Sequence, residues 1–138
     1  MSETLDCVFP IHPRTRTKLE NLGFLNRLQL NPRFHILEPI GYIDFMRLQK
    51  DASVILTDSG GLQEESTFFG VPCLTVRNNT ERPVTITHGT NKLIGTEYTN
   101  IPYEVEQAIS VVSERSTIPE LWDGKAAERI AAVINNGL

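Results

Sequence analysis

SVILTDSGGLQEE, residues 53–65, joins a short apolar run to a Ser-Gly-Gly turn and then to a polar segment that is typical of a helix. The pattern predicts a buried strand, a tight turn and a helix that begins directly after it. Glycines let the backbone approach a ligand closely, and the unpaired N–H groups of a first helical turn favour negative charge. Ser59, Gly60 and Gly61 are therefore a candidate anion site, although a plain strand-to-helix connection explains the local sequence equally well.

The sequence on both sides of this stretch alternates short apolar runs with helix-like segments, which is typical of a parallel α/β sheet with flanking helices. We expect strands over residues 7–11, 34–37, 54–57, 73–76 and 92–94. We expect helices over residues 14–21, 42–50, 62–69, 101–114 and 125–135, and a short turn after Arg82. Ser59 and Gly60 follow a strand end, which is where ligands bind in open α/β sheets. No linker divides the 138 residues, so we expect a single domain, 1–138.

The charge balance argues against two classes of partner. Lys and Arg together number 13, Asp and Glu number 17, and the formal net charge is −4. An acidic chain without a basic cluster is not expected to bind nucleic acid or an anionic membrane. An anionic ligand would instead be held by local groups, namely helix N-termini and a few arginines.

Several simple features place the chain in a cellular context. It has no apolar stretch of about 20 residues, the length that spans a bilayer. Residues 1–6 are acidic and lack the plan of a signal peptide, so we expect a cytoplasmic protein. Cys7 and Cys73 each lie in an apolar run and are expected to be buried thiols, in neither a disulfide nor a metal site.

Two further residues could contact an anionic or sugar-bearing ligand. Arg82 could grip phosphate oxygens with its planar guanidinium, or it could simply pair with Glu81 or contact a carbonyl near the turn. Glu65, one turn beyond the glycines, could accept hydrogen bonds from sugar hydroxyls, or it could be an ordinary exposed carboxylate. Periodicity alone does not choose among Gln63, Glu64 and Glu65.

The remaining candidates have simple structural explanations. Phe45 is explained as a core aromatic of an amphipathic helix, and His12 as a structural histidine just past a strand. His35 and His88 lack the spacing of metal ligands. The GxSxG, GxGxxG and GxxxxGK[ST] motifs are absent, so Ser59 is interpreted as a binding residue and not as a nucleophile.

Taken together, six segments make the chain resemble the C-terminal part of a non-hydrolysing UDP-N-acetylglucosamine 2-epimerase. They lie in the family's order over nearly the whole chain: FPIHPRT (residues 9–15), YIDF (42–45), LTDSGGLQEE (56–65), GVPCLTVRNNTERP (70–83), GTNKLIGT (89–96) and DGKAAERI (123–130). The combination of DSGG, QEE and TERP is the specific part of the match. Val84 departs from the pattern, because the family usually has Glu directly after TERP.

The resemblance implies a GT-B-type enzyme, in which two Rossmann-like domains close on UDP-N-acetylglucosamine and invert C2 to give UDP-N-acetylmannosamine. The implied chemistry is elimination of UDP after proton removal at C2, followed by re-addition. Neither a metal nor a redox cofactor is implied. A homodimer and a role in cell-surface polysaccharide biosynthesis are implied for the full-length enzyme.

The resemblance also implies a role for individual residues. Ser59, Gly60, Gly61 and Arg82 would hold the diphosphate, and the second Glu of QEE, Glu65, would accept the ribose diol. Phe45 would stack near the uracil. His12 matches a histidine that in parts of the family lies between the domains, near a second, regulatory UDP-sugar.

The family keeps its catalytic carboxylates in a preceding domain that this sequence does not include. The family's GHRREN-like segment, which carries an active-site histidine, is missing from the sequence as well. We therefore expect no catalytic residue in this chain and no epimerase activity from it alone. The family's C-terminal domain also begins with a strand and helix that residues 1–6 are too few to supply, so we expect that unit to be missing.

Three other functions remain open at this point. A hydrolysing epimerase, which releases free N-acetylmannosamine, would differ in residues outside this chain. A GT-B glycosyltransferase is disfavoured by the DSGG, QEE and TERP set. A stand-alone UDP-binding or interaction module would bind without chemistry of its own.

Overall fold

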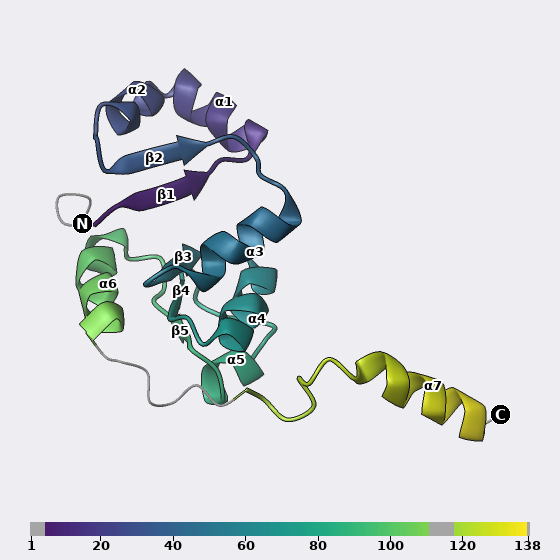
Figure 1. Cartoon of the computed structure of the whole chain (residues 1–138). Helices are drawn as coiled ribbons and strands as arrows, with labels where there is room; N and C mark the ends of the chain where they lie inside the picture. The colour runs from purple at the N-terminus through teal and green to yellow at the C-terminus, as the bar shows by residue number, and fades with distance from the viewer. Residues whose placement is uncertain (1–4, 111–117, 138) are drawn as a thin grey trace. The chain divides into compact units, whose positions relative to one another are not determined.

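The computed structural model describes residues 5–110 and 118–137, and Figure 1 shows the order of the elements along the chain. The chain divides into two compact units, residues 1–47 and residues 48–138, which we call the N-terminal unit and the C-terminal unit. In the part of the chain that the structure describes, no helix is both long enough and apolar enough to span a bilayer.

The N-terminal unit contains a parallel strand pair and two helices. β1 (Cys7–Pro10) pairs with β2 (Phe34–Leu37), with Cys7 opposite Phe34. Between them lie α1 (Pro13–Asn21) and α2 (Phe24–Gln29), which are separated by Gly23 at φ 71°, a left-handed backbone that favours glycine. α2 was not predicted, because its short FLNRLQ sequence gives less than two turns of periodicity.

The C-terminal unit carries a three-stranded parallel sheet in the order β3-β4-β5. These strands are Ile55–Thr57, Cys73–Thr75 and Asn91–Leu93. α3 (Tyr42–Lys50) precedes β3 and contains the boundary between the two units, so that only its residues from Leu48 onward belong to the C-terminal unit. α4 (Gly60–Phe69) connects β3 to β4, and α5 (Val84–Thr87) lies before β5. The core at β3 and β4 is formed by Ile55, Val71 and Cys73, with Ala52, Leu62 and Phe69 packed against it.

The C-terminal part of this unit adds further helical elements. The short 3-10 helix η1 (Tyr98–Asn100) leads into α6 (Ile101–Ser110), which contacts β4 and buries Val105. Lys92 on β5 pairs with Glu104 on α6 at 2.6 Å between Nζ and Oε2. The last helix, α7 (Ala126–Gly137), has no residue that is buried within the described structure.

The sequence predictions of the elements are confirmed with small differences. All five strands lie within one residue of their predicted bounds, and all of their pairings are parallel. α4 begins at Gly60 and not at Leu62, because the glycines form the first turn of the helix and Ser59 is its N-cap. The predicted helix over 101–114 is observed from Ile101 to Ser110, and its last four predicted residues lie outside the described residues. The single-domain assignment stays a prediction.

The two cysteines are free thiols, as expected. Cys73 is completely buried, whereas Cys7 is only half-buried. Desolvation by burial raises the pKa of both thiols, and for Cys73 hydrogen bonds with Ser66 and Thr75 partly oppose this rise. Both side chains therefore stay protonated at neutral pH and behave as small apolar groups.

Candidate functional site

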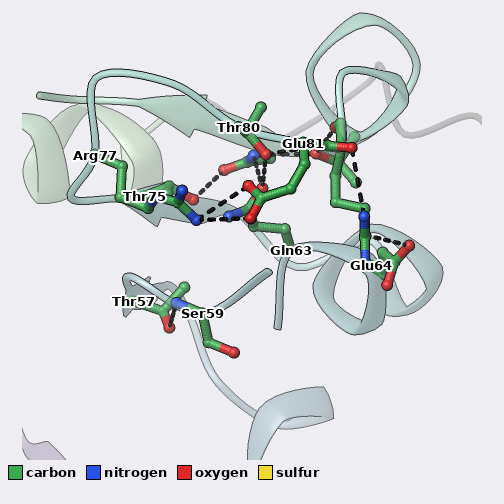
Figure 2. A network of polar contacts seen from close by, with 11 residues as sticks. Thr57, Ser59, Gln63, Glu64, Thr75, Arg77, Thr80 and Glu81 are labelled. Carbon is green, nitrogen blue, oxygen red and sulfur yellow. Dashed lines mark hydrogen bonds and ion pairs between the residues drawn. The ribbon is translucent and has the colours of Figure 1, made fainter. Parts of the chain in front are cut away.

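The turn between β3 and α4 is held by a hydrogen bond from the backbone of Ser59, and the Ser59 side chain does not cap the helix. Ser59 has extended dihedrals, φ −83° and ψ 130°, and its backbone N–H donates to Thr57 Oγ1 at 3.0 Å (Figure 2). Its own hydroxyl makes no capping hydrogen bond to the described first turn of α4. The hydroxyl and the first-turn N–H groups are thus arranged at one end of the helix, where a negative charge is favoured.

Gly60 and Gly61 are not required by the backbone or by packing. Neither has a positive φ. A Cβ atom added to Gly60 would meet no described atom within 4 Å, and one added to Gly61 would meet only Ser59 Oγ at 3.9 Å. The structure therefore gives no steric reason for these two glycines, which favours their interpretation as a place where a ligand approaches the backbone.

The inner face of α4 carries a buried network of polar side chains. Gln63 is 0% exposed, and its Oε1 accepts hydrogen bonds from Thr80 Oγ1 at 2.6 Å and Asn91 Nδ2 at 3.1 Å (Figure 2). Asn91 also accepts from Thr75 Oγ1 at 2.6 Å and donates to Thr85 Oγ1 at 3.0 Å. The network therefore joins α4, β4, β5, α5 and the loop that follows β4.

This network fixes the backbone of Arg82. Thr80 Oγ1 accepts a hydrogen bond from the Arg82 N–H at 3.0 Å. The Arg82 carbonyl accepts from both the backbone N–H and the hydroxyl of Thr85, at 3.0 and 2.7 Å. Because both the N–H and the carbonyl of Arg82 are held, the position from which its long side chain extends is set by the partly buried Thr80 and the buried Thr85.

The Arg82 guanidinium lies beside α4 in contact with Glu64. Its Nε is 2.9 Å from Glu64 Oε1, in an ion pair whose alignment is not that of a hydrogen bond. Its Nη1 donates to the Glu81 carbonyl at 3.4 Å. Glu64 lies four residues after Gly60, hence on the same face of α4. Arg82 and the Ser-Gly-Gly turn are therefore neighbours along one face of the helix.

The structural interpretation of Arg82, a pair with Glu81 or a contact with a carbonyl near the turn, is only partly observed. Its contact with a carbonyl is present, but the Glu81 carboxylate pairs with Arg77, at 3.1 Å, and not with Arg82. Hydrogen bonds from the backbone N–H of Glu81 and from Arg77, together with the nearby positive charge, lower the pKa of Glu81. An exposed pair such as Arg82–Glu64 contributes only about 0–1 kcal/mol, so a ligand can displace it at small cost.

Glu65 has a buried partner that the sequence did not indicate. Gln49 Nε2 donates to Glu65 Oε2 at 2.6 Å, and Gln49 is 3% exposed. Glu65 lies four residues after Gly61 and so shares that residue's face of α4. The sequence does not indicate this role of Gln49. Gln49 is one of several polar residues in α3, and their spacing does not show which of them contacts a carboxylate. The sequence pattern gives no role to Gln63 for the same reason.

Phe45 and His12 belong to the N-terminal unit. Phe45 is partly exposed on α3. His12 is the N-cap of α1, and its Nδ1 accepts a hydrogen bond from the Arg14 N–H at 3.2 Å. The structural explanation of His12 is therefore realised, and the ligand roles of both residues stay predictions. The described residues hold no group of three or more His, Cys, Asp or Glu side chains that could bind a metal ion.

Comparison with known proteins relates the chain to one family. A family model described as UDP-N-acetylglucosamine 2-epimerase matches residues 1–135. The UDP-N-acetylglucosamine 2-epimerase of Methanocaldococcus jannaschii is 41% identical over 130 residues, which cover 94% of this chain and 35% of the relative. That of Methanococcus maripaludis is 43% identical over 127 residues, which cover 92% and 34%.

A solved structure supports the same relationship. The M. jannaschii UDP-GlcNAc 2-epimerase in complex with UDP-GlcNAc and UDP superimposes with a TM-score of 0.79 at 39% identity, over 94% of this chain and 35% of that one. The chain thus spans about a third of the length of the curated relatives that it matches. The expected likeness to GT-B-type epimerases is confirmed over that length.

Proposed function

The chain belongs to the UDP-N-acetylglucosamine 2-epimerase family, and we propose that it supplies the UDP-binding part of an enzyme that interconverts UDP-N-acetylglucosamine and UDP-N-acetylmannosamine. One observation carries the proposal. The open turn at Gly60 and the guanidinium of Arg82 lie along the same face of α4, so an anion at the helix N-terminus has both backbone N–H groups and a positive charge within reach.

In the proposed complex the diphosphate occupies the N-terminal turn of α4. Ser59, Gly60 and Gly61 offer N–H groups and a hydroxyl, and Arg82 exchanges Glu64 for a phosphate oxygen. The diphosphate as a whole carries more negative charge than one carboxylate, and its oxygens match the guanidinium fork, which supports this exchange. Glu65 accepts the ribose hydroxyls, Phe45 contacts the uracil, and His12 contributes to a regulatory or interdomain site.

The proposed contacts with the diphosphate have a direct consequence for the reaction. Loss of the C2 proton and departure of UDP would leave negative charge on the leaving group. Preorganised N–H groups and a guanidinium stabilise such charge, an electrostatic effect that is often the largest contribution to catalysis. This chain would therefore assist the cleavage of the bond to UDP, while proton transfer at C2 is carried out by groups outside it.

The binding proposal is tested by calorimetric titration of the chain with UDP and with uridine. UDP should bind more tightly than uridine by at least roughly a hundredfold, because two charge-assisted hydrogen bonds of about 1.5 kcal/mol each already amount to that factor. Equal affinities for the two ligands would overturn the assignment of the diphosphate site.

Proton exchange at C2 tests the proposal that the groups that transfer this proton lie outside this chain. When the 138-residue chain is incubated with UDP-N-acetylglucosamine in heavy water, NMR should show no deuterium at C2 beyond a control without protein. Incorporation that a substitution within this chain abolishes would place the catalytic groups here. Release of free N-acetylmannosamine by a longer protein that contains this chain would favour the hydrolysing reaction.

Several wider features remain part of the proposal. They are a single UDP-binding domain over residues 1–138, a preceding catalytic domain, a homodimer, a cytoplasmic location and a role in cell-surface polysaccharide biosynthesis. The alternative of a stand-alone UDP-binding module predicts the same UDP affinity and no partner domain. A DNA sequence that encodes the preceding half in the same reading frame would favour the enzyme.

A further inference from the structure

We propose that Gln49 is a positioning residue that holds the Glu65 carboxylate in place for the ribose hydroxyls of the nucleotide. The inference rests on the proposed function, because it needs Glu65 to be the ribose-binding group. Gln49 lies in the last turn of α3 and Glu65 in the middle of α4, both within the C-terminal unit. A short hydrogen bond joins them, from Gln49 Nε2 to Glu65 Oε2 at 2.6 Å.

The burial of Gln49 shows that this contact is specific. Gln49 is 3% exposed, and its Oε1 has no hydrogen-bond partner among the described residues. A buried carbonyl oxygen without a partner lowers stability. The amide nevertheless keeps this orientation, because the Glu65 carboxylate only accepts hydrogen bonds and turning the amide over would bring two oxygens together. The arrangement favours the position of the carboxylate over the stability of the fold, as is expected of a residue that supports a site.

The contact also suits the task of Glu65. A glutamate side chain loses rotamer freedom when it binds a ligand, and a buried donor to the charged group fixes it beforehand. A carboxylate offers about four lone-pair positions, so a hydrogen bond from Gln49 is compatible with further hydrogen bonds to the same group. Gln49 acts through Glu65 and need not touch the ligand.

The test measures how strongly the chain distinguishes UDP from its 2′,3′-dideoxy analogue. We define the ribose ratio as the Kd of the dideoxy analogue divided by the Kd of UDP. Gln49→Met removes the donor but keeps the length of the side chain, and it should lower the ribose ratio about three- to tenfold, the range expected for one hydrogen bond. In a Glu65→Gln background the same substitution should lower the ratio no further, because the two residues act as one unit.

Two further variants separate positioning from folding. Gln49→Glu keeps the shape of the side chain but places an acceptor against the Glu65 carboxylate, so it should lower the ratio at least as much as Gln49→Met. The exchange of both residues, Gln49→Glu with Glu65→Gln, restores a hydrogen bond between the two positions. It should raise the thermal midpoint above that of Gln49→Glu alone without restoring the ribose ratio. Gln107→Met, at an exposed amide on α6, is the matched control and should leave the ratio unchanged.

The possible outcomes distinguish the two levels of inference. A ribose ratio that stays at the wild-type value in both Gln49 variants would show that Gln49 does not position Glu65. If both affinities then fall equally, Gln49 acts through the fold alone. This result overturns the role of Gln49 and leaves the proposed function standing. Failure of the wild-type chain to bind UDP would overturn the proposed function, and this inference would fall with it.

Discussion

The two sides of α4 carry polar groups that differ in their exposure to solvent. On the inner side Gln63 is 0% exposed and its Oε1 bonds only to other protein side chains. On the outer side Glu64 and Arg82 form an ion pair in which the side chains are 42% and 43% exposed. Buried hydrogen bonds are strong and costly to break, whereas an exposed ion pair is neither. A ligand can therefore displace the outer pair while the inner network keeps the loop in place.

The glycines near α4 give the largest expected contrast between the two sides. A Cβ atom at Gly89 would lie 2.3 Å from Thr67 Oγ1 and 2.5 Å from the Thr85 carbonyl, and both residues are buried. Gly89→Ala should therefore lower the free energy of unfolding by about 3 kcal/mol, the upper part of the range for overpacked cores. Chemical denaturation of the wild type and the variant measures the change.

Gly60→Ala is the matched control on the outer side. Its added methyl group meets no described atom within 4 Å, and alanine suits a helix better than glycine by about 1 kcal/mol. The variant should fold at least as stably as the wild type but bind UDP more weakly. A loss of stability like that of Gly89→Ala would show that the turn is structural and that its glycines serve the fold.

Asn91 tests how much the inner network contributes. Its side chain accepts from Thr75 and donates to Gln63 and Thr85, so Asn91→Ala removes one hydrogen bond from each of three buried side chains. We expect the free energy of unfolding to fall by about 2–3 kcal/mol, the summed contribution of the lost buried hydrogen bonds. Glu64→Gln, on the outer side, should change it by less than about 1 kcal/mol in the same denaturation experiment. Similar values for the two variants would remove the distinction between the faces.

These residues also show where sequence analysis succeeds and where it stops. The strands and α4 were predicted because apolar runs and the Ser-Gly-Gly turn are local patterns. Gln63 and Asn91 were not predicted, since they are 28 positions apart and only the fold brings them together. Gly89 gave no local sign that a methyl group there would collide with Thr67. The role of Glu65 came from resemblance, because three consecutive polar residues leave periodicity without a choice.

Arg82 tests whether the outer side is the binding side. Arg82→Ala should weaken UDP binding by about 1.5–3 kcal/mol, the contribution of a charge-assisted contact to phosphate. Its effect on stability should stay below about 1 kcal/mol, because the pair that it loses is exposed. Calorimetric titration and denaturation of the same sample measure the two effects. An unchanged affinity for UDP would leave the guanidinium with the modest structural role of its contacts to Glu64 and the Glu81 carbonyl.

The smallest effect is expected at Asp123, which extends the comparison to an exposed ion pair that includes no residue of α4. Asp123 lies before α7 and accepts hydrogen bonds from Arg129 Nη1 and the Lys125 N–H, each at 3.0 Å. The hydrogen bond from Arg129, followed by that from Lys125, lowers the pKa of Asp123 from 3.8 to about 2. A carboxyl group with a lowered folded-state pKa stabilises the fold above the unfolded value, and this contribution is lost as pH falls through the folded value.

The pH window follows from these two values. Between pH 4 and pH 2 the wild type should progressively lose the hydrogen bond to the Lys125 N–H, and NMR titration of that amide should report a midpoint near 2. Asp123→Asn, which carries no charge, should show no such transition. Since both partners are exposed to solvent, added salt should move the midpoint towards 3.8. A midpoint that salt does not change would mean that the pair is shielded like the network beneath α4, and exposure would then be a poor guide to which contacts a ligand can displace.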